Sequence, residues 1–585
     1  MKKQLQALLD QSLRVLESEG MVITVKQDDI KIEYSRDPLH GDFASNLAMV
    51  LAKSCNCNPR ELANRITENL PKSDLIKRTE IAGPGFINFF LNQNSYQSVV
   101  LDILEKGETY GNSKIGDNQS TLIEFVSANP TGPLHIGHGR GAAYGAAIAN
   151  LLKKTGFNIH CEYYVNDSGR QMDILTVSAW MRYLQQHDKE ICFPENAYKG
   201  HYITDIAADL KNKYANKFVT PHKDILDLLD KKEEADIKID KLIKHCASIL
   251  GMENYRLILE TCLDSILSSI KNDLSEFGVE FNNWYSEYSL LKNNSVNQCI
   301  AKLNDRSWVY QKDGAEWFRS SKLGDEKDRV LVRENGQKTY FASDIAYHLS
   351  KFERGYKKII NIWGADHHGY IERIKASMKA LDYPPEAIRI LLVQFATLFR
   401  GKEKLQMSTR SGEFITLKEL INEVGKDAAR FIMLNRSNDA ELDFDFSKVK
   451  EKSKENHLYY VQYCYARISS VFRHINKNLE DPINIKKYNF NYTTDEIRIF
   501  KKLAEWPVCI KVASNKLEPH RLPIYLYELA SEFHSYWNLG NDNEKKRFID
   551  KNNKITDEKL VILKSVSNVI KIGLDIIGVN SPKKM

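Results

Sequence analysis

The chain has 585 residues, a net charge of +6 at pH 7 and a hydrophobic fraction of 42%. A chain of this length is too long for a single compact core, so we expect about three to four domains. No segment has the roughly 18 uninterrupted apolar residues that a membrane span needs, so we expect no membrane contact.

The N-terminal segment and the cysteines both indicate an intracellular protein. Residues 1–20 have apolar side chains at helical spacing, interrupted by acids and glutamines, which predicts an amphipathic helix rather than a signal peptide. The nine cysteines are scattered and odd in number, unlike a disulfide framework. Cys55 and Cys57 lack the paired spacing of a zinc site. We therefore expect a cytoplasmic protein without protein-bound zinc or another metal.

Residues 1–112 predict a small α+β domain. Short helices and strands alternate there, and residues 81–91 contain a turn followed by the alternation of a closing strand. Gly107, Gly111 and Gly116 mark a linker to the next domain.

Residues 121–152 predict a strand, a loop and a helix that begins with two histidines. His135 and His138 then lie on one face of the first helical turn, where free N–H groups and the helix dipole attract phosphate. Gly137 lies between them and has no side chain that would block the close approach of a nucleotide. Paired histidines also bind metals or fill polar corners. The strand, loop and helix order favours a triphosphate site.

Residues 159–165 predict a second strand of a parallel, Rossmann-like sheet, in which ligands bind at the carboxyl ends of strands. Asn166 and Asp167 follow it, where they suit either a functional role or a turn that caps the next helix. Residues 183 to about 275 then interrupt the pattern with a charged helical run, which indicates a helical insertion with solvated faces.

The second half of the sheet resumes near Trp284. Residues 330–333 and 359–363 both have the composition of buried strands. The second of these runs into a polar segment that contains Gly364, Asp366, His367 and His368. These side chains can bind a metal ion, but Asp and His after Gly suit hydrogen bonding to a nucleotide better.

A loop rich in lysine, arginine and glycine occupies residues 400–412. Such a loop suits closure over a leaving pyrophosphate, although an ordinary basic surface loop has the same composition. The C-terminal quarter is also basic, with a formal charge of about +7 from Glu451 onward against about −1 for the rest. Residues 456–468 and 522–539 predict helices with aromatic side chains on successive turns, as in a buried bundle or an RNA-binding surface.

Residues 127–140, SANPTGPLHIGHGR, resemble the HIGH signature of class I aminoacyl-tRNA synthetases, in the long form of the arginyl-tRNA synthetases. Residues 198–202, YKGHY, resemble a further element of that family, and the resemblance covers nearly the whole chain. It implies a tRNA-contacting α+β domain at 1–112, a Rossmann-like catalytic domain at 113–440 with the insertion, and an all-α anticodon-binding bundle at 441–585.

The resemblance also implies a nucleotide site. ATP would be held by Pro133, His135, Gly137, His138, Gly364, Asp366, His367, His368 and Met407. Residues 406–410, QMSTR, resemble the KMSKS loop of the class, with Gln406 where the first lysine is expected. Lys402, Lys404 and Arg410 are the candidates for the cation that neutralises pyrophosphate. The implied catalytic set is His135, His138, Lys404, Gln406, Ser408 and Arg410.

The amino-acid specificity rests on two acids. A guanidinium is planar and always charged, so its pocket needs carboxylates and neutral acceptors at fixed angles. Glu124 lies in an otherwise apolar strand, where an unpaired carboxylate is costly. Asp344 lies at a strand-to-helix junction, where a plain N-cap is the alternative. The resemblance completes the arginine site with Ser127, Asn129, His138 and Tyr340.

The implied partners are ATP with Mg²⁺, L-arginine and tRNA(Arg). Arginyl adenylate would form with release of pyrophosphate, in a step expected to need tRNA, and would pass to the terminal adenosine of the tRNA. The implied RNA-facing residues are Tyr459, Tyr463, Arg467, Trp537 and Met585. The resemblance further implies a monomer. Two alternatives stay open: a synthetase or nucleotidyltransferase for another substrate, and a non-catalytic tRNA-binding protein of the same fold.

Overall fold

The computed structural model describes residues 1–25, 29–35, 37–187, 189, 191–220, 223–229, 234–405, 414–483 and 491–585. These residues form two compact units. The first unit contains residues 1–110, 471–505 and 532–568, and the second contains residues 111–470, 506–531 and 569–585.

An antiparallel sheet of order β1-β2-β4-β3 and short helices form the N-terminal part of the first unit. The strands are β1 (Glu33–Tyr34), β2 (Phe43–Ser45), β3 (Ile76–Ala82) and β4 (Phe86–Leu91). The helices are α1 (Lys2–Ser18), α2 (Leu47–Leu51), α3 (Pro59–Glu68) and α4 (Gln97–Lys106). Helix α1 buries Leu5, Leu9, Leu13 and Leu16 because their spacing places them on one face. The predicted α+β fold of this region is confirmed.

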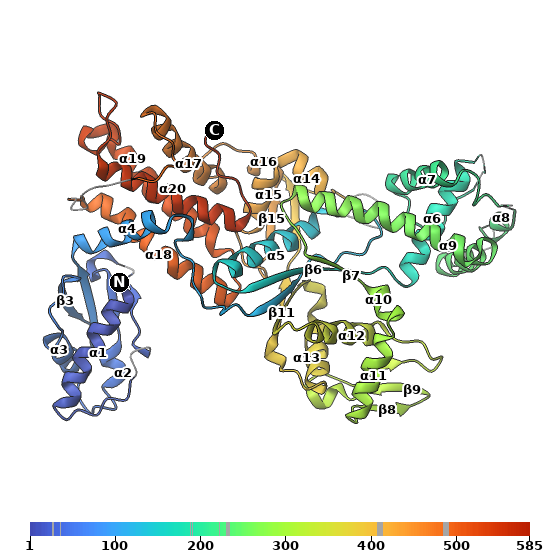
Figure 1. Cartoon of the computed structure of the whole chain (residues 1–585), viewed down its shortest axis with the longest axis horizontal. Coiled ribbons are helices and arrows are strands. Elements are labelled where there is room, and N and C mark those ends of the chain that lie inside the picture. Colours follow the sequence, from blue (N-terminus) through green and yellow to red (C-terminus); the bar gives the residue numbers. More distant parts are fainter. Residues whose placement is uncertain are drawn as a thin grey trace. The chain divides into compact units, whose positions relative to one another are not determined.

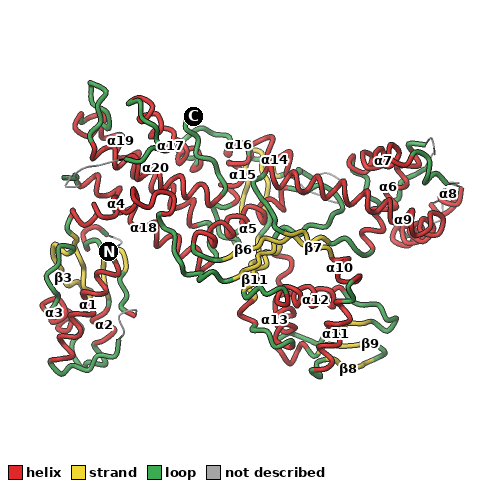
Figure 2. The backbone as a smooth tube through the Cα atoms, viewed as in Figure 1, coloured by secondary structure: helices red, strands yellow, loops and turns green. Residues whose placement is uncertain are grey.

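The described residues from 457 onward form helices joined by loops (Figure 2). The helices are α17 (His457–His474), α18 (Thr494–Lys516), α19 (Arg521–Asp542) and α20 (Asp557–Ile577). In the first unit, Phe533 and Tyr536 of α19 contact the ring of Phe548, which gives that part an aromatic core. This arrangement confirms the predicted all-α C-terminal region.

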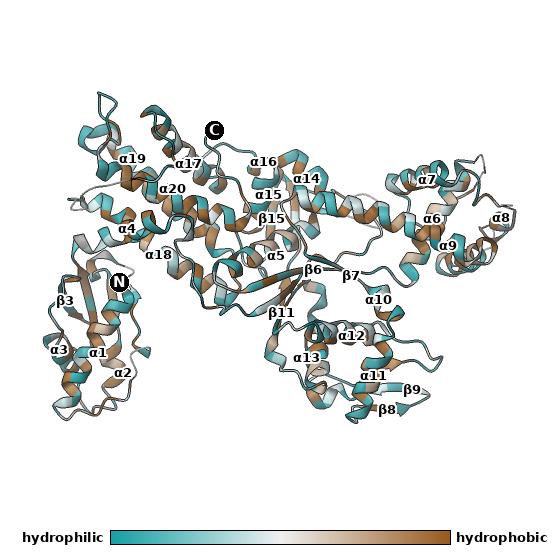
Figure 3. Ribbon diagram, viewed as in Figure 1, coloured by the Kyte–Doolittle hydropathy of each residue, from teal (hydrophilic) through white to brown (hydrophobic). Residues whose placement is uncertain are grey.

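A parallel sheet of order β12-β11-β5-β6-β7 forms the centre of the second unit. The strands are β5 (Ser120–Glu124), β6 (Asn158–Val165), β7 (Asn283–Ser286), β11 (Lys358–Gly364) and β12 (Ile388–Val393). Strand β11 is largely hydrophobic because both faces of the sheet are covered (Figure 3). The predicted Rossmann-like sheet is confirmed, and the carboxyl ends of its strands share one edge.

Helices cover the two faces of this sheet (Figure 1). Helix α5 (Ile136–Lys154) approaches β5 so closely that a Cβ on Gly145 would lie 2.3 Å from the ring of Phe125. On the other face lie α11 (Ser295–Asp305), α12 (Tyr340–Glu353) and α13 (Ile371–Ala380). Their apolar side chains share a core with Ile359 of β11 and Ile388 of β12.

A helical insertion separates β6 from β7, as the sequence predicts. It contains α6 (Arg170–Gln185), α7 (His201–Tyr214), α8 (Lys223–Leu229) and α9 (Ala235–Glu276). Helix α9 is two helices joined at a kink, because Gly251 has a φ of 71° that interrupts the helical backbone. Helix α6 packs on both α7 and α9.

The strand predicted at residues 330–333 does not belong to the parallel sheet. It is β10 (Arg329–Val332), which pairs antiparallel with β9 (Ala315–Phe318), and β9 pairs in turn with β8 (Val309–Lys312). A short apolar run looks the same in either kind of sheet, and here only Leu331 is fully buried.

A last sheet of order β14-β13-β15 follows the central one along the chain. It contains β13 (Ala396–Arg400), β14 (Glu403–Lys404) and β15 (Leu442–Asp445). The neighbouring helices are α14 (Leu417–Val424), α15 (Lys426–Met433) and α16 (Phe446–Val449), and α10 (Glu287–Lys292) directly follows β7. Among the described residues, no helix combines the length and apolar character needed to cross a membrane.

Candidate active site

The two histidines form the cap of helix α5. His135 is the N-cap residue, and its Nδ1 accepts a hydrogen bond from the backbone N–H of Gly137 at 3.1 Å. The Nδ1 of His138 accepts one from the backbone N–H of His135 at 3.3 Å. The two rings stack with their centroids 3.8 Å apart. His135 thus precedes the first helical turn, in which the sequence analysis placed it, and His138 lies within that turn.

These hydrogen bonds fix the tautomer of both rings. An Nδ1 that accepts a hydrogen bond carries no proton, so each neutral imidazole has its N–H at Nε2. Burial lowers the pKa of His135, and burial together with His135 lowers the pKa of His138 to about 3. Both rings are therefore neutral at pH 7 and can donate from Nε2 at the positive end of the helix, an arrangement that suits phosphate.

The loop before α5 is held in an unusual backbone conformation. Val126 and Ser127 have φ values of 69° and 42°, which side chains other than glycine rarely adopt. In this conformation the Ser127 hydroxyl donates to Glu124 at 3.1 Å and accepts from the backbone N–H of Tyr164 at 3.1 Å. Such strain clusters at functional sites, and here it directs the Ser127 side chain to a carboxylate.

The YKGHY element of the insertion packs on the same loop. The Tyr202 hydroxyl donates to the carbonyl oxygen of Thr131 at 2.6 Å. A Cβ on Gly132 would lie 3.0 Å from the Tyr202 ring, so this position favours glycine. Pro133 follows in the same loop and is half-buried. Tyr202 therefore ties the helical insertion to the loop that delivers the histidines.

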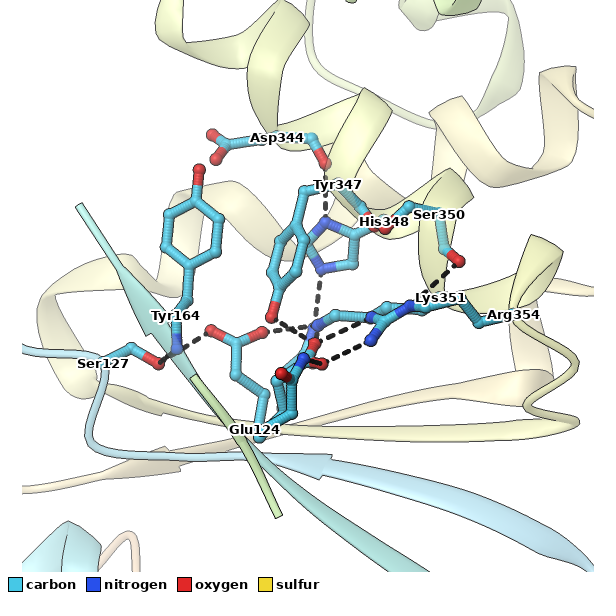
Figure 4. A network of polar contacts seen from close by, with 12 residues as sticks. Glu124, Ser127, Tyr164, Asp344, Tyr347, His348, Ser350, Lys351 and Arg354 are labelled. Atoms are coloured by element: carbon cyan, nitrogen blue, oxygen red, sulfur yellow. Dashed lines mark hydrogen bonds and ion pairs between the residues drawn. The ribbon is translucent and has the colours of Figure 1, made fainter. Parts of the chain in front are cut away.

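Glu124 is a buried carboxylate with a fixed cation beside it (Figure 4). The Lys351 ammonium of α12 donates to Glu124 at 2.5 Å and to the Oδ1 of Asn361 at 2.9 Å. The side chain of Lys351 is 0% exposed and that of Glu124 is 6% exposed. This ion pair keeps the carboxylate at a defined place at the end of β5, with its other oxygen toward Ser127.

A second buried carboxylate on β6 anchors the other end of α12. Arg354 donates to both oxygens of Glu162, at 2.5 and 2.8 Å, and the Tyr347 hydroxyl donates to it at 2.9 Å. Asn361, which accepts from Lys351, also makes a hydrogen bond with His348 of α12 at 2.8 Å. These contacts hold α12 against the sheet and so set the place of Asp344 one turn earlier.

Asp344 is not an N-cap. Thr339 is the N-cap residue of α12, and Asp344 lies in its second turn with a half-buried side chain that accepts from the Tyr370 hydroxyl. Burial, together with the negative charges of Glu287 and Glu124, raises the pKa of Asp344 to about 7. This excludes the simple capping alternative and leaves a second acid beside Glu124.

Glu287 is a third acid of this group, which the sequence analysis missed. It is the first residue of α10, is 6% exposed and makes a hydrogen bond with Ser168. Burial and the nearby charge of Asp167 raise its pKa to about 7. Burial and the charges of Glu287, Asp344 and Glu124 also raise the pKa of Tyr164, so all three acids lie near one tyrosine at the end of β6.

The remaining residues expected for arginine lie around the same edge of the sheet. Tyr340 is the first residue of α12 and is 65% exposed, and its hydroxyl lies 3.2 Å from where a Cβ of Gly169 would be. The Asn129 amide donates to the Oε1 of Gln171 at 2.9 Å. The exposed ring of Tyr340 is free to cover a flat cation.

The residues expected to bind the nucleotide lie at the ends of β11 and β12. Gly364 ends β11, and the exposed Asp366, His367 and His368 follow in the 3₁₀ turn η6 (Ala365–Tyr370). Phe395, just after β12, is 52% exposed. Its ring lies 3.5 Å from a Cβ position on Gly137 and 3.4 Å from one on Gly364. Phe395 was not singled out from the sequence; its signal is an exposed aromatic directly after a buried strand.

The basic closing loop is only partly described. Lys404 is exposed at the end of β14, whereas Gln406, Met407, Ser408 and Arg410 lie outside the described residues. Glu423 of α14 pairs with Arg400 at 3.0 Å and with Lys450 at 3.1 Å. Within the described ranges, no group of three or more His, Cys, Asp or Glu side chains is placed to hold a metal ion.

The residues expected to face RNA lie in different structural environments. Tyr459 and Tyr463 of α17 are half-buried and stack nearly parallel, with centroids 5.8 Å apart, and the Arg467 guanidinium lies 4.6 Å from the Tyr463 ring. Trp537 contacts Phe533 and Phe548, so its half-buried ring belongs to an aromatic cluster of the first unit. Met585 is 55% exposed in the second unit.

Three family models match the chain, and together they span most of it. The model of the class I (R) tRNA synthetase catalytic domain matches residues 99–457. The model of the arginyl tRNA synthetase N terminal domain matches residues 3–91, and that of the DALR anticodon binding domain matches residues 461–585. The parallel sheet, the capped helix at its edge and the matched catalytic domain define a class I aminoacyl-tRNA synthetase.

Similar proteins identify the family within the class I aminoacyl-tRNA synthetases. The chain is 48% identical to an arginine–tRNA ligase of Thioalkalivibrio sulfidiphilus and 46% identical to one of Coxiella burnetii, with 100% of both chains covered in each case. The Thermus thermophilus arginyl-tRNA synthetase has the same fold, with a TM-score of 0.72, 18% identity and 100% of both chains covered. The chain belongs to the arginine–tRNA ligase family.

Proposed function

We propose that this chain attaches L-arginine to tRNA(Arg) in two steps, through arginyl adenylate. The observation that carries the proposal is the group of three buried or half-buried acids, Glu124, Glu287 and Asp344, near Tyr164 at the carboxyl edge of the sheet. Lys351 is the cation paired with Glu124, so when the acids are ionised the group has an excess of negative charge. Free arginine brings a guanidinium and an ammonium, and both are cations that such a site attracts.

Each end of arginine has its own partners in this proposal. Glu287 and Asp344 face the guanidinium, and Tyr340 covers its plane. Glu124, Ser127 and Asn129 hold the ammonium, at the loop that leads into α5. This direction places the carboxylate of arginine near His138, where ATP has to be attacked.

The nucleotide occupies the edge formed by α5, β11 and β12. The phosphates lie at the start of α5, between Pro133 and Gly137, and accept hydrogen bonds from the Nε2–H groups of His135 and His138. Met407 and the segment Gly364, Asp366, His367 and His368 hold the ribose and the adenine. Phe395, between the two glycines, stacks on the base.

The chemistry is positioning and charge stabilisation rather than covalent catalysis. The arginine carboxylate attacks the α-phosphorus, and the bond to the bridging oxygen of pyrophosphate breaks. Mg²⁺ enters with ATP and neutralises its phosphates. Lys404, Gln406, Ser408 and Arg410 close over the pyrophosphate as it leaves. A hydroxyl of the terminal adenosine of the tRNA then attacks the adenylate.

The rest of the chain provides the RNA contacts in this account. We assign residues 1–112 to tRNA contact, 113–440 to catalysis and 441–585 to anticodon binding. Tyr459, Tyr463 and Arg467, which follow one another along one face of α17, are the main candidates for RNA stacking, with Trp537 and Met585 as further contacts. A cytoplasmic monomer is part of the proposal, and sedimentation at micromolar concentration would test the monomer.

Aminoacylation of tRNA(Arg) with labelled arginine tests the role of the acids. Glu287→Gln removes the charge of one acid while keeping its shape, and loss of a charged hydrogen bond should raise the KM for arginine about tenfold or more. The matched control is Glu280→Gln, the same substitution at an exposed residue seven positions away. Equal KM values for the two variants would contradict the proposed guanidinium site.

A further inference from the structure

Asp167 uses both of its carboxylate oxygens on the first turn of helix α10. One oxygen accepts from the hydroxyl of Ser286 at 2.5 Å, and the other accepts from the backbone N–H of Tyr288 at 2.8 Å. These two donors lie on either side of Glu287 in the sequence. The carboxylate of Asp167 therefore binds the residues on both sides of Glu287, the third acid of the site.

This contact joins segments that are more than a hundred residues apart. It differs from the turn or helix cap that was one of the two alternatives for Asp167. Helix α6, which follows Asp167, has Gly169 at its N-cap and no side-chain cap. The neighbouring Ser168 makes a hydrogen bond with the Glu287 side chain. Two successive residues of one loop thus hold Glu287: Asp167 binds its two neighbours in the chain, and Ser168 binds its carboxylate.

We propose that Asp167 is a positioning residue for arginine recognition, which sets both the place and the charge of Glu287. The inference rests on the proposed function, because it requires that Glu287 receives the guanidinium. Asp167 does not touch substrate in this account. It acts by fixing the start of α10 and by placing a negative charge next to Glu287.

The charged and titratable groups around Glu287 come from several elements. Asp167 lies on the loop after β6, Tyr164 at the end of β6 and Asp344 on α12. The negative charge of Asp167 makes ionisation of Glu287 less favourable. An ionised Glu287 in turn makes ionisation of Asp344 and Tyr164 less favourable. Removing the charge of Asp167 should therefore make Glu287 ionise at lower pH, while Asp344 and Tyr164 stay in place.

The test uses the full-length enzyme with ATP and tRNA(Arg), and measures the KM for arginine, the KM for ATP and kcat as functions of pH. Asp167→Ala removes the hydrogen bonds and the charge, and should raise the KM for arginine about tenfold or more, with less than about a threefold change in kcat and in the KM for ATP. Asp167→Asn keeps the shape and one of the two accepting oxygens. It should raise the KM less and move the midpoint of the arginine pH profile to lower pH.

The control is Asp240→Asn, which loses an exposed ion pair with Arg170 at the end of the same loop. It should behave like the wild type. An unchanged KM for arginine in Asp167→Ala, an unmoved pH midpoint in Asp167→Asn, or an equal effect of Asp240→Asn would overturn the inference. Failure of the proposed function itself would look different, because the wild-type enzyme would then show no arginine-dependent activity. Should Asp167→Ala not fold, the pH midpoint of Asp167→Asn decides.

Discussion

Replacing His138 with asparagine separates its two roles at the start of α5. The Nδ1 of His138 accepts from the backbone of His135 at 3.3 Å, which leaves the Nε2–H to donate to substrate. The amide oxygen of asparagine can take the place of Nδ1, but its side chain has nothing at the position of Nε2. His138→Asn should therefore keep the helix cap and lose the donor.

The expected size of each effect follows from what such donors and helix caps contribute in proteins. A donor directed at charge that develops in the transition state contributes roughly 10²–10³ in kcat, so His138→Asn should lose about this much. Loss of a helix cap costs about 1 kcal/mol of stability, so His138→Ala should show that destabilisation in addition and His138→Asn should not. Because the pKa of His138 is about 3, its protonation contributes no change in kcat between about pH 5 and 8.

Two measurements on each variant decide the point: kcat for aminoacylation at saturating substrates, and the thermal midpoint of unfolding. His138→Asn with a normal midpoint and a strongly reduced kcat fits the assignment of the donor. A kcat within about threefold of the wild type would refute it.

Other predictions concern the acids and the loop. Lys351→Met leaves the Glu124 carboxylate buried without its cation and should destabilise the protein by about 3–5 kcal/mol in urea unfolding. Adding Glu124→Gln to this variant should recover much of the lost stability. Equal stabilities of the single and double variants would contradict the buried ion pair. In the proposed site arginine binds the ionised forms of Glu287 and Asp344, whose pKa values are about 7. Its affinity should therefore fall by up to about tenfold per pH unit for each acid as the pH drops below 7. Calorimetric titration with arginine measures this, and a flat profile would speak against both acids. Tyr202→Phe removes the hydrogen bond to Thr131 in the loop before α5 and should lower kcat by a few-fold, with unchanged folding by circular dichroism. Full activity of this variant would show that the insertion does not stabilise the loop.

Local sequence patterns predicted the elements that bear the site. The strand, loop and helix around His135 and His138 follow from apolar spacing, prolines and small residues, all within about 30 positions. The same reasoning failed for β10, because a short apolar run does not reveal its neighbours. Parallel and antiparallel partners are chosen by the rest of the fold.

The acids show where sequence reasoning ends. Glu124 stood out as a charge in an apolar strand, but its partner Lys351 lies 227 residues away inside an ordinary helical pattern. Glu287 lies in a polar segment with no local signal, and its importance depends on contacts with Ser168 and the nearby Asp344. Such roles arise only when distant segments meet, so they need the folded structure.

The most direct test of the account is ATP–pyrophosphate exchange by the full-length protein with each of the common amino acids, in the presence of tRNA(Arg). The group of Glu124, Glu287 and Asp344 predicts exchange with arginine, and none above background with lysine or any uncharged amino acid, because only the guanidinium can bind two acids with its planar fork of donors. Stimulation by another amino acid, or none by arginine, would contradict the account.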